Sequence, residues 1–438
     1  MIEALKNAFR LPDLRNKLLY TLLILVVYQF AAHVPVPGVN RDALQALFNS
    51  EGAGLVNVLN LLSGGAVHNF SVMANGVYPF ITAQIIIQLL TPIIPQLEEI
   101  QREPGGQEKL NQYTYYLAIP MAALQAWGQI NIFTSLAGGE QIVAGFGSDP
   151  FITLSTIITM TAGTMFAIWL GNLITEDGIG QGLSVIIFSG IVARVPYNLG
   201  RLILNSPNAL FNIAVFVGLT VITVIVIVVV QEGVRRIPVQ YGKRVRGRKI
   251  YGGGSTFVPL RVNTAGMIPL IFAQSIMAFP AVIVSLFPKG PVGDAITNAF
   301  GSQRGFTYWF LYFLLVVGFT YFYTDVMIQN QKLSENLQRQ GGFIPGLRPG
   351  KRTQDFITHV VRRITLVGAL FLGLVAVLPG VVQGLNTLFF PEAAGDFGSN
   401  PALVISSAGL IIVVGVVIDT MRQLEAQLVM RNYDAFMR

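Results

Sequence analysis

The sequence predicts an all-α integral membrane protein, a polytopic bundle of ten transmembrane helices, and three observations support this class. Of the 438 residues, 53% are hydrophobic and 12% are charged, whereas soluble domains average about 25% charged residues. Apolar runs of roughly 17 to 25 residues, long enough to cross about 30 Å of hydrocarbon, recur along the chain. Lysine and arginine concentrate in alternate loops between these runs, as expected for loops that face the cytoplasm.

The apolar runs define the predicted spans. They cover residues 18–34, 74–94, 113–136, 151–173, 183–203, 211–230, 264–287, 306–327, 363–382 and 401–421. An amphipathic segment, residues 1–17, precedes the first run, and no small-residue cleavage site follows that run. The first span is therefore expected to be a retained anchor. Residues 422–438 form a predicted C-terminal tail.

The basic residues also predict the orientation of the spans. With these limits, 24 of the 29 lysines and arginines fall in segments on the same side of the membrane as the N-terminus. Cytoplasmic loops hold the excess of basic residues in membrane proteins. Both termini are therefore expected to be cytoplasmic.

One hydrophobic segment, residues 55–73, is unsuited to crossing a bilayer. Ser63, Gly64 and Gly65 interrupt it, and it also contains asparagines and a histidine. A broken helix at membrane depth is stable only where protein buries it or where it lines a water-filled cavity. The segment is therefore predicted to be re-entrant.

Two predicted cytoplasmic loops, residues 231–263 and 328–363, are long and hold fifteen basic residues between them. The loop at 174–182 has none, so the topology rule alone does not require such density. Alternating polar and apolar residues over 235–261 favour a protruding hairpin. We expect an anionic partner, such as ribosomal RNA or an acidic motor surface, to dock here. The candidate partner-binding residues are Arg235, Arg236, Lys243, Arg244, Arg246, Arg248, Lys249, Arg348, Lys351 and Arg352.

No catalytic, metal or cofactor site is expected. The chain has no cysteine, and its three histidines are scattered, so no zinc motif is present. The glycine alternation at 178–182 lacks the strand of a dinucleotide-binding unit. In the phosphate-loop-like stretch 350–353, Arg352 stands where serine or threonine must bind magnesium. These features argue against an enzyme.

The principal alternative function is a secondary transporter, which also uses inverted repeats and broken helices. Such a protein needs ionisable or polar ligands near the membrane midplane. The predicted spans hold almost no ionisable residues, and Asp325 and Asp419 lie near span ends. A structural membrane protein without a pore is a third class, in which the broken segment would have no purpose.

Six ordered segments carry a resemblance to a known family. They are residues 62–66 (LSGGA), 78–81 (YPFI), 85–90 (IIIQLL), 178–184 (GIGQGLS), 262–269 (VNTAGMIP) and 346–350 (GLRPG). Together they resemble the SecY family of secretion channels along nearly the full chain. The resemblance implies two inverted five-helix halves, residues 18–203 and 211–421, with a hinge at 204–210.

The resemblance also implies roles for individual residues. The pore ring would consist of Val77, Ile81, Leu183, Ile187, Ile271 and Ile412. The plug, residues 55–73, would have Asn60, Leu61, Leu62, Ser63, Gly64 and Gly65 at its centre. The lateral gate would include Thr82, Ile85 and Phe279. An aliphatic ring suits this role because it excludes water when empty and binds no particular side chain. Val77 and Leu183 depart conservatively from the isoleucine common in some bacterial members.

The partners that the resemblance implies are the small membrane subunits SecE and SecG, the SecA motor ATPase and the ribosome. The substrates would be signal sequences and nascent or precursor polypeptides, and the gate would open to membrane lipids. A signal sequence would enter the gate by partitioning from water into lipid. The expected location is the bacterial cytoplasmic (inner) membrane, which the chain would cross several times.

Overall fold

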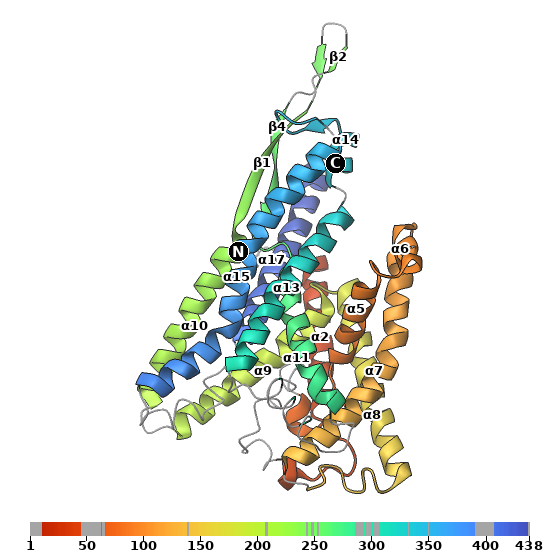
Figure 1. The fold of residues 1–438 in the computed structure, drawn as a ribbon, viewed down its shortest axis with the longest axis vertical. Helices are drawn as coiled ribbons and strands as arrows, with labels where there is room; N and C mark the ends of the chain where they lie inside the picture. Colours follow the sequence, from red (N-terminus) through yellow and green to blue (C-terminus); the bar gives the residue numbers. More distant parts are fainter. Residues whose placement is uncertain are drawn as a thin grey trace.

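The computed structural model is a bundle of long helices topped by a small β-sheet (Figure 1). It describes residues 11–44, 63, 66–137, 140–205, 209–241, 244–246, 249–251, 254–284, 293, 296, 300, 306–331, 333–348, 350–389 and 407–436. We call the end of the bundle that carries the sheet the basic end, since the candidate partner-binding residues lie there.

Every predicted span coincides with a helix in the described parts of the chain. In the N-terminal half these helices are α2 (Pro12–Ala32), α5 (Tyr78–Leu90), α7 (Gly106–Leu136), α8 (Pro150–Asp177) and α9 (Gly182–Asn205). In the C-terminal half they are α10 (Ala209–Glu232), α11 (Ile268–Val284), α13 (Phe306–Gln331), α15 (Lys351–Phe389) and α17 (Ser407–Phe436). Shorter helices are η1 (Ala66–Asn69), α6 (Pro95–Arg102) and α14 (Leu333–Arg339).

The outward faces of these helices are apolar. On α2, Leu22 and Phe30 are 59% and 76% exposed, and Ile158 on α8 is 58% exposed. Large exposed apolar surfaces are rare in soluble proteins but are required against lipid. In the described residues, four helices are long and apolar enough to cross a membrane unaided: α2, α8, α13 and α15. The pair α5 and α6 is bent by 103° and makes a fifth candidate.

Helix limits differ from the predicted spans where a helix continues beyond the apolar run. Helix α15 begins at Lys351, well before residue 363, because Thr353, Ile357 and Val361 form a buried stripe on an otherwise exposed stretch. Helix α5 begins only at Tyr78, after a turn in which Gly76 adopts φ 54°. Helix α17 continues through the predicted tail to Phe436.

The two basic loops fold together at the basic end. The predicted hairpin is formed by β1 (Val234–Tyr241) and β4 (Ser255–Arg261), and its tip by β2 (Arg244–Arg246) and β3 (Lys249–Tyr251). The second loop adds β5 (Gly342–Phe343), so the sheet order is β4-β1-β5. Ile237, Val239, Leu260, Leu337, Ile344, Ile357 and Val361 form a separate core beneath it. The loops are therefore one folded unit outside the helical bundle.

Candidate functional site: an aliphatic cluster between the two halves

The six predicted ring residues lie together. Val77 is the N-cap of α5, with Ile81 one turn further; Leu183 and Ile187 occupy the first turns of α9. Ile271 comes from α11 and Ile412 from α17. Five of them are buried members of one hydrophobic cluster, and the half-buried Leu183 packs against it. Two helices from each half thus contribute aliphatic side chains to this cluster, which also contains other side chains, among them Tyr28, Met73, Phe272 and Tyr323.

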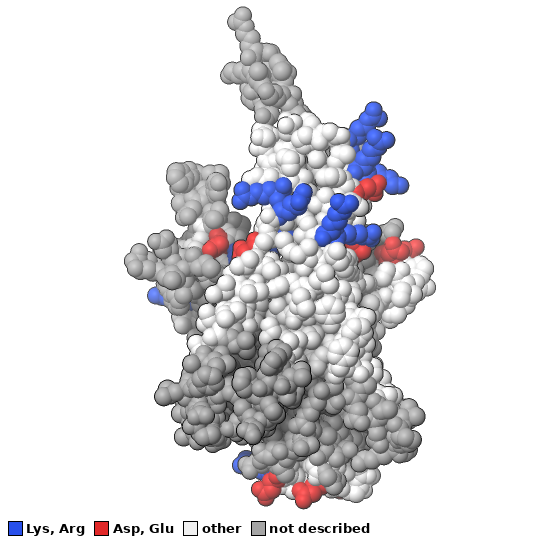
Figure 2. Space-filling view, turned by 60° about the vertical axis from the view of Figure 1, so that its left-hand side comes forward, with Lys and Arg blue, Asp and Glu red and all other residues white. Residues whose placement is uncertain are grey.

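The interior of the bundle is uncharged in the described parts of the chain. Buried polar side chains there are serine, threonine, asparagine and glutamine, and none is Asp, Glu, Lys or Arg. On the face shown in Figure 2, charged side chains lie toward the upper and lower ends, and the described (white) surface between them is uncharged. Such a distribution fits a protein embedded in a membrane and lacks the buried charges of an ion pathway.

The predicted gate residues lie where α5 meets α11. The Tyr78 hydroxyl on α5 donates a hydrogen bond of 2.6 Å to the carbonyl oxygen of Ser275 on α11. Thr82 and Ile85 are buried, and Phe279 is half-buried on α11. Tyr78 was not among the gate residues predicted from the sequence. It could have been noticed as a tyrosine within an apolar run, because a buried tyrosine hydroxyl needs a hydrogen-bond partner.

Buried polar side chains lie on the helices that form and adjoin this contact. Gln125 Nε2 on α7 lies 3.4 Å from Thr82 Oγ1. Among the buried side-chain atoms of the neighbouring helices, Gln125 Oε1 and Gln129 Nε2 on α7 and Ser275 Oγ on α11 have no hydrogen-bond partner. Buried polar atoms without partners carry a desolvation cost. Water that enters this region can supply the missing hydrogen bonds, which lowers the cost of hydrating it.

Of the predicted plug, residues 55–73, the structure describes Ser63 and residues 66–73. Asn60, Leu61, Leu62, Gly64 and Gly65 lie outside the described residues. Ser63 is buried, and its carbonyl oxygen accepts a 2.7 Å hydrogen bond from the Tyr28 hydroxyl on α2. The last residues of this segment are fixed by a backbone bridge between Pro35 and Ser71 and by close packing of Gly163 on the Val72 carbonyl.

The candidate partner-binding residues gather at the basic end. Arg235 and Arg236 are exposed on β1, and the Arg236 guanidinium lies 4.8 Å from the Phe257 ring centroid. Arg244 and Arg246 lie on β2 and Lys249 on β3, whereas Lys243 and Arg248 lie outside the described residues. Arg348, Lys351 and Arg352 are exposed at the start of α15. Residues from both loops therefore share one surface.

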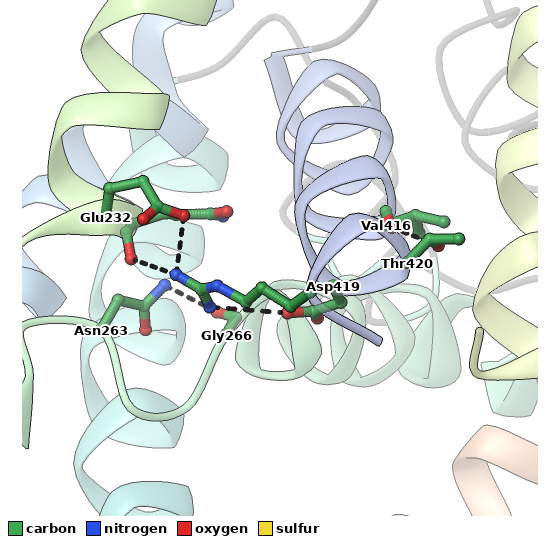
Figure 3. Close-up of polar contacts among 8 residues, drawn as sticks. Glu232, Asn263, Gly266, Val416, Asp419 and Thr420 are labelled. Atoms are coloured by element: carbon green, nitrogen blue, oxygen red, sulfur yellow. Dashed lines mark hydrogen bonds and ion pairs between the residues drawn. The ribbon is translucent and has the colours of Figure 1, made fainter. Parts of the chain in front are cut away.

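A polar junction that the sequence did not predict fixes α17 to the base of the hairpin (Figure 3). Arg422 donates to Glu232 Oε1 at 2.8 Å and approaches the Gln231 carbonyl at 3.4 Å. Burial and the neighbouring Arg422 lower the pKa of Arg261 on β4. The Arg422 contacts hold the end of α10 to α17.

Comparisons with known proteins agree with this architecture. The family model described as SecY matches residues 71–421. The chain is 38% identical to the protein translocase subunit SecY of Thermus thermophilus, over 100% of this chain and 98% of that protein. It is 40% identical to the same subunit of Streptomyces coelicolor, over the whole of both chains.

Solved structures agree in fold. A protein conducting channel superimposes with a TM-score of 0.62 at 17% identity, covering 94% of this chain and 92% of that one. Sec61 in the canine ribosome-channel complex also gives 0.62, at 15% identity and with the same coverage. The family model, the full-length relatives and the shared fold show that this chain belongs to the SecY family.

Proposed function

We propose that this chain forms the protein-conducting channel through which unfolded secretory polypeptides cross the bacterial cytoplasmic membrane. The observation that carries the proposal is the convergence of six aliphatic side chains from α5, α9, α11 and α17 between the two halves, in a chain of the SecY family. A channel must seal when empty and accept any sequence when open. A soft aliphatic constriction does both, because it dewets when nothing fills it and offers no fixed hydrogen bond.

Hydrophobic segments of the translocating polypeptide would pass from the pore into the lipid between α5 and α11. The contact between these helices includes one hydrogen bond, from Tyr78 to the Ser275 carbonyl, and buried polar atoms without partners lie on α7 and α11. An apolar signal sequence gains roughly 25 cal/mol for each Å² that it transfers from water to lipid. Partitioning, and not recognition of a sequence, would therefore select the segments that open the gate.

The basic surface at the hairpin and the start of α15 is proposed to dock the ribosome and the SecA motor, with SecE and SecG as membrane partners. The solved relative in a ribosome-channel complex supports a ribosome partner. This assignment places the basic end and both termini in the cytoplasm, in agreement with the distribution of basic residues. The halves 18–203 and 211–421 would move about the connection at 204–210, and the chain would itself catalyse no reaction.

The test is reconstitution of the full chain with SecE, SecG and SecA in vesicles, followed by protease protection of an added precursor. The expected result is ATP-dependent protection that disappears when the apolar core of the signal sequence is made polar. Uptake of a small solute without precursor protection would instead support the transporter alternative, which no buried ionisable side chain in the described parts of the chain favours.

A further inference from the structure

The last part of the predicted plug is held between the chain that follows α2 and helix α8. The Val36 amide donates to the Phe70 carbonyl oxygen at 3.0 Å, and the Val72 amide donates to the Val34 carbonyl oxygen, also at 3.0 Å. On the other side Gly163 of α8 packs on the Val72 carbonyl, since a Cβ added to this glycine would lie 1.9 Å from the carbonyl oxygen. Paired backbone groups and close packing leave this segment little freedom.

Phe70 adopts a backbone conformation that is unusual for a large side chain. It follows the short helix η1 with φ 42°, in the left-handed region. The turn is closed by hydrogen bonds from the Phe70 amide to the Val67 carbonyl oxygen at 3.0 Å and from the Ser71 amide to the Ala66 carbonyl oxygen at 3.1 Å. Glycine is usual at such a position, because a Cβ strains the backbone there. Phenylalanine persists in this conformation only where its surroundings fix it.

The phenyl ring of Phe70 supplies the compensating contact. It is fully buried and packs edge-on against Phe133 of α7, with 5.9 Å between the ring centroids. Both rings belong to an apolar cluster at the end of the bundle where α7 ends and α8 begins, opposite the basic end (Figure 1). We call this the outer end. Ile142, from the loop between α7 and α8, lies in the same cluster. The ring therefore joins the end of the plug segment to α7 and to a neighbouring outer loop.

The segment continues into α5 through further fixed contacts. The Gly76 amide donates to the Met73 carbonyl oxygen at 2.8 Å, and the Asn75 side chain donates to the Ala122 carbonyl oxygen of α7 at 3.1 Å. The next residue is Val77, the predicted ring residue that caps α5. One side of the ring is thus attached directly to this segment.

We propose that residues 66–77, which we call the collar, are a fixed wall at the outer end of the channel and not part of the moving plug. Phe70 is the anchor that holds the collar to α7. The hydrogen bonds and close contacts that fix the collar all lie within the N-terminal half, so it keeps its place there while a polypeptide passes. The C-terminal limit of the plug then moves from residue 73 to a point before residue 66. This inference rests on the proposed channel function.

A disulfide tests whether the collar moves, and the test is specific because the chain has no cysteine. Pro35 and Ser71 form an antiparallel bridge. The hydrogen bonds on either side of it make them a non-hydrogen-bonded pair, whose Cα atoms lie about 4.5 Å apart, a spacing that suits a disulfide. With Pro35→Cys and Ser71→Cys oxidised, the reconstituted channel should translocate a precursor within about twofold of its reduced form. Each single variant is a control. Loss of translocation on oxidation alone would overturn the inference, because the collar would then have to leave the chain after α2.

Phe133→Leu tests the anchor without altering the strained turn. The resting conductance should rise by roughly two- to tenfold, the factor that one aromatic pair contributes, because the collar leads directly into the ring. The disulfide between positions 35 and 71 should restore the wild-type conductance, since it replaces the lost contact. Leu372→Ala, which removes a buried side chain from the C-terminal half, should lower the Tm without raising the conductance. Wild-type conductance in a folded Phe133→Leu channel, or a rise that the disulfide does not reverse, would refute the anchor.

Hydrogen exchange gives a measurement on the unmodified chain. The amides of Ser71 and Val72 should be equally protected with and without an engaged precursor, whereas exchange that becomes about tenfold faster would show that the collar opens. Failure of the proposed function is recognised separately, since the wild-type chain would then translocate no precursor under any condition.

Discussion

Replacing two ring residues by asparagine should open the seal. Ile81 and Ile187 are 6% and 1% exposed and come from α5 and α9. Losing the burial of one isoleucine side chain costs about 1.5–3 kcal/mol, and burying an amide without partners costs about 1–3 kcal/mol more. Two amides in one cluster can bond to each other, so about 3 kcal/mol is a conservative total for the closed state.

An open, hydrated ring removes this penalty, because water bonds to both amides. At about 1.4 kcal/mol for each factor of ten, the ratio of open to closed channels should rise by roughly 100-fold. The assay is ion conductance in planar bilayers without a substrate, together with translocation of a precursor whose signal has a shortened apolar core. Both should increase, since less partitioning energy is then needed to hold the gate open.

Two control variants separate a broken seal from a damaged fold. Ile81→Val with Ile187→Val keeps the ring apolar and should leave the resting conductance low. Val226→Asn changes a lipid-facing residue of α10 that is 41% exposed, and should reduce insertion or stability without raising conductance. Wild-type conductance in a folded Ile81→Asn, Ile187→Asn channel would show that these residues are not the constriction.

Three further predictions concern docking, packing and the plug. Arg348→Glu should weaken binding and translocation driven by SecA or the ribosome in a salt-dependent way, whereas Arg41→Glu near the opposite end should not; unchanged binding would exclude this surface. Gly163→Ala should destabilise the fold by about 1–3 kcal/mol and so lower the Tm measured in detergent, because the new Cβ would lie 1.9 Å from the Val72 carbonyl oxygen. Gly318→Ala is the control, since a Cβ at Gly318 meets no atom within 4 Å. Tyr28→Phe should cost about 1 kcal/mol of stability and raise the resting conductance, since it removes the 2.7 Å hydrogen bond to the carbonyl of the plug residue Ser63; an unchanged Tm and conductance would contradict this.

Span positions were predictable because membrane thickness fixes the length of an apolar run. The length of the apolar run predicted the end of α5 wrongly. The run continues to residue 94, but the helix ends at Leu90, before Thr91 and Pro92. A hydropathy window averages over such turns. Glycine and proline, which set these limits, are common in membrane helices and are weak signals there.

Contacts between distant residues had no local signature. Tyr78 and Ser275 are 197 residues apart, and Gly180 and Gln423 are 243 apart; neither pair follows from composition or periodicity. The sequence also did not predict that the two basic loops join in one sheet, because β5 has only two residues and is separated in the chain from its partner β1 by α11, α13 and α14. The aliphatic ring residues came from resemblance to the family, since isolated apolar residues in apolar spans are indistinguishable from lipid contacts.

The position of α9 has a consequence for the shape of the open pore. Leu183 and Ile187 lie on α9, the helix that leads into the connection between the two halves, so they would move little when the halves move about that connection. Ile81 and Ile271 lie on α5 and α11, the helices of the proposed gate, and would be displaced most. The ring would therefore open as a cleft that widens toward the gate and not as a uniformly dilating circle. A polypeptide held in such a cleft remains in contact with lipid at its open side, so each segment can partition while it is passing through.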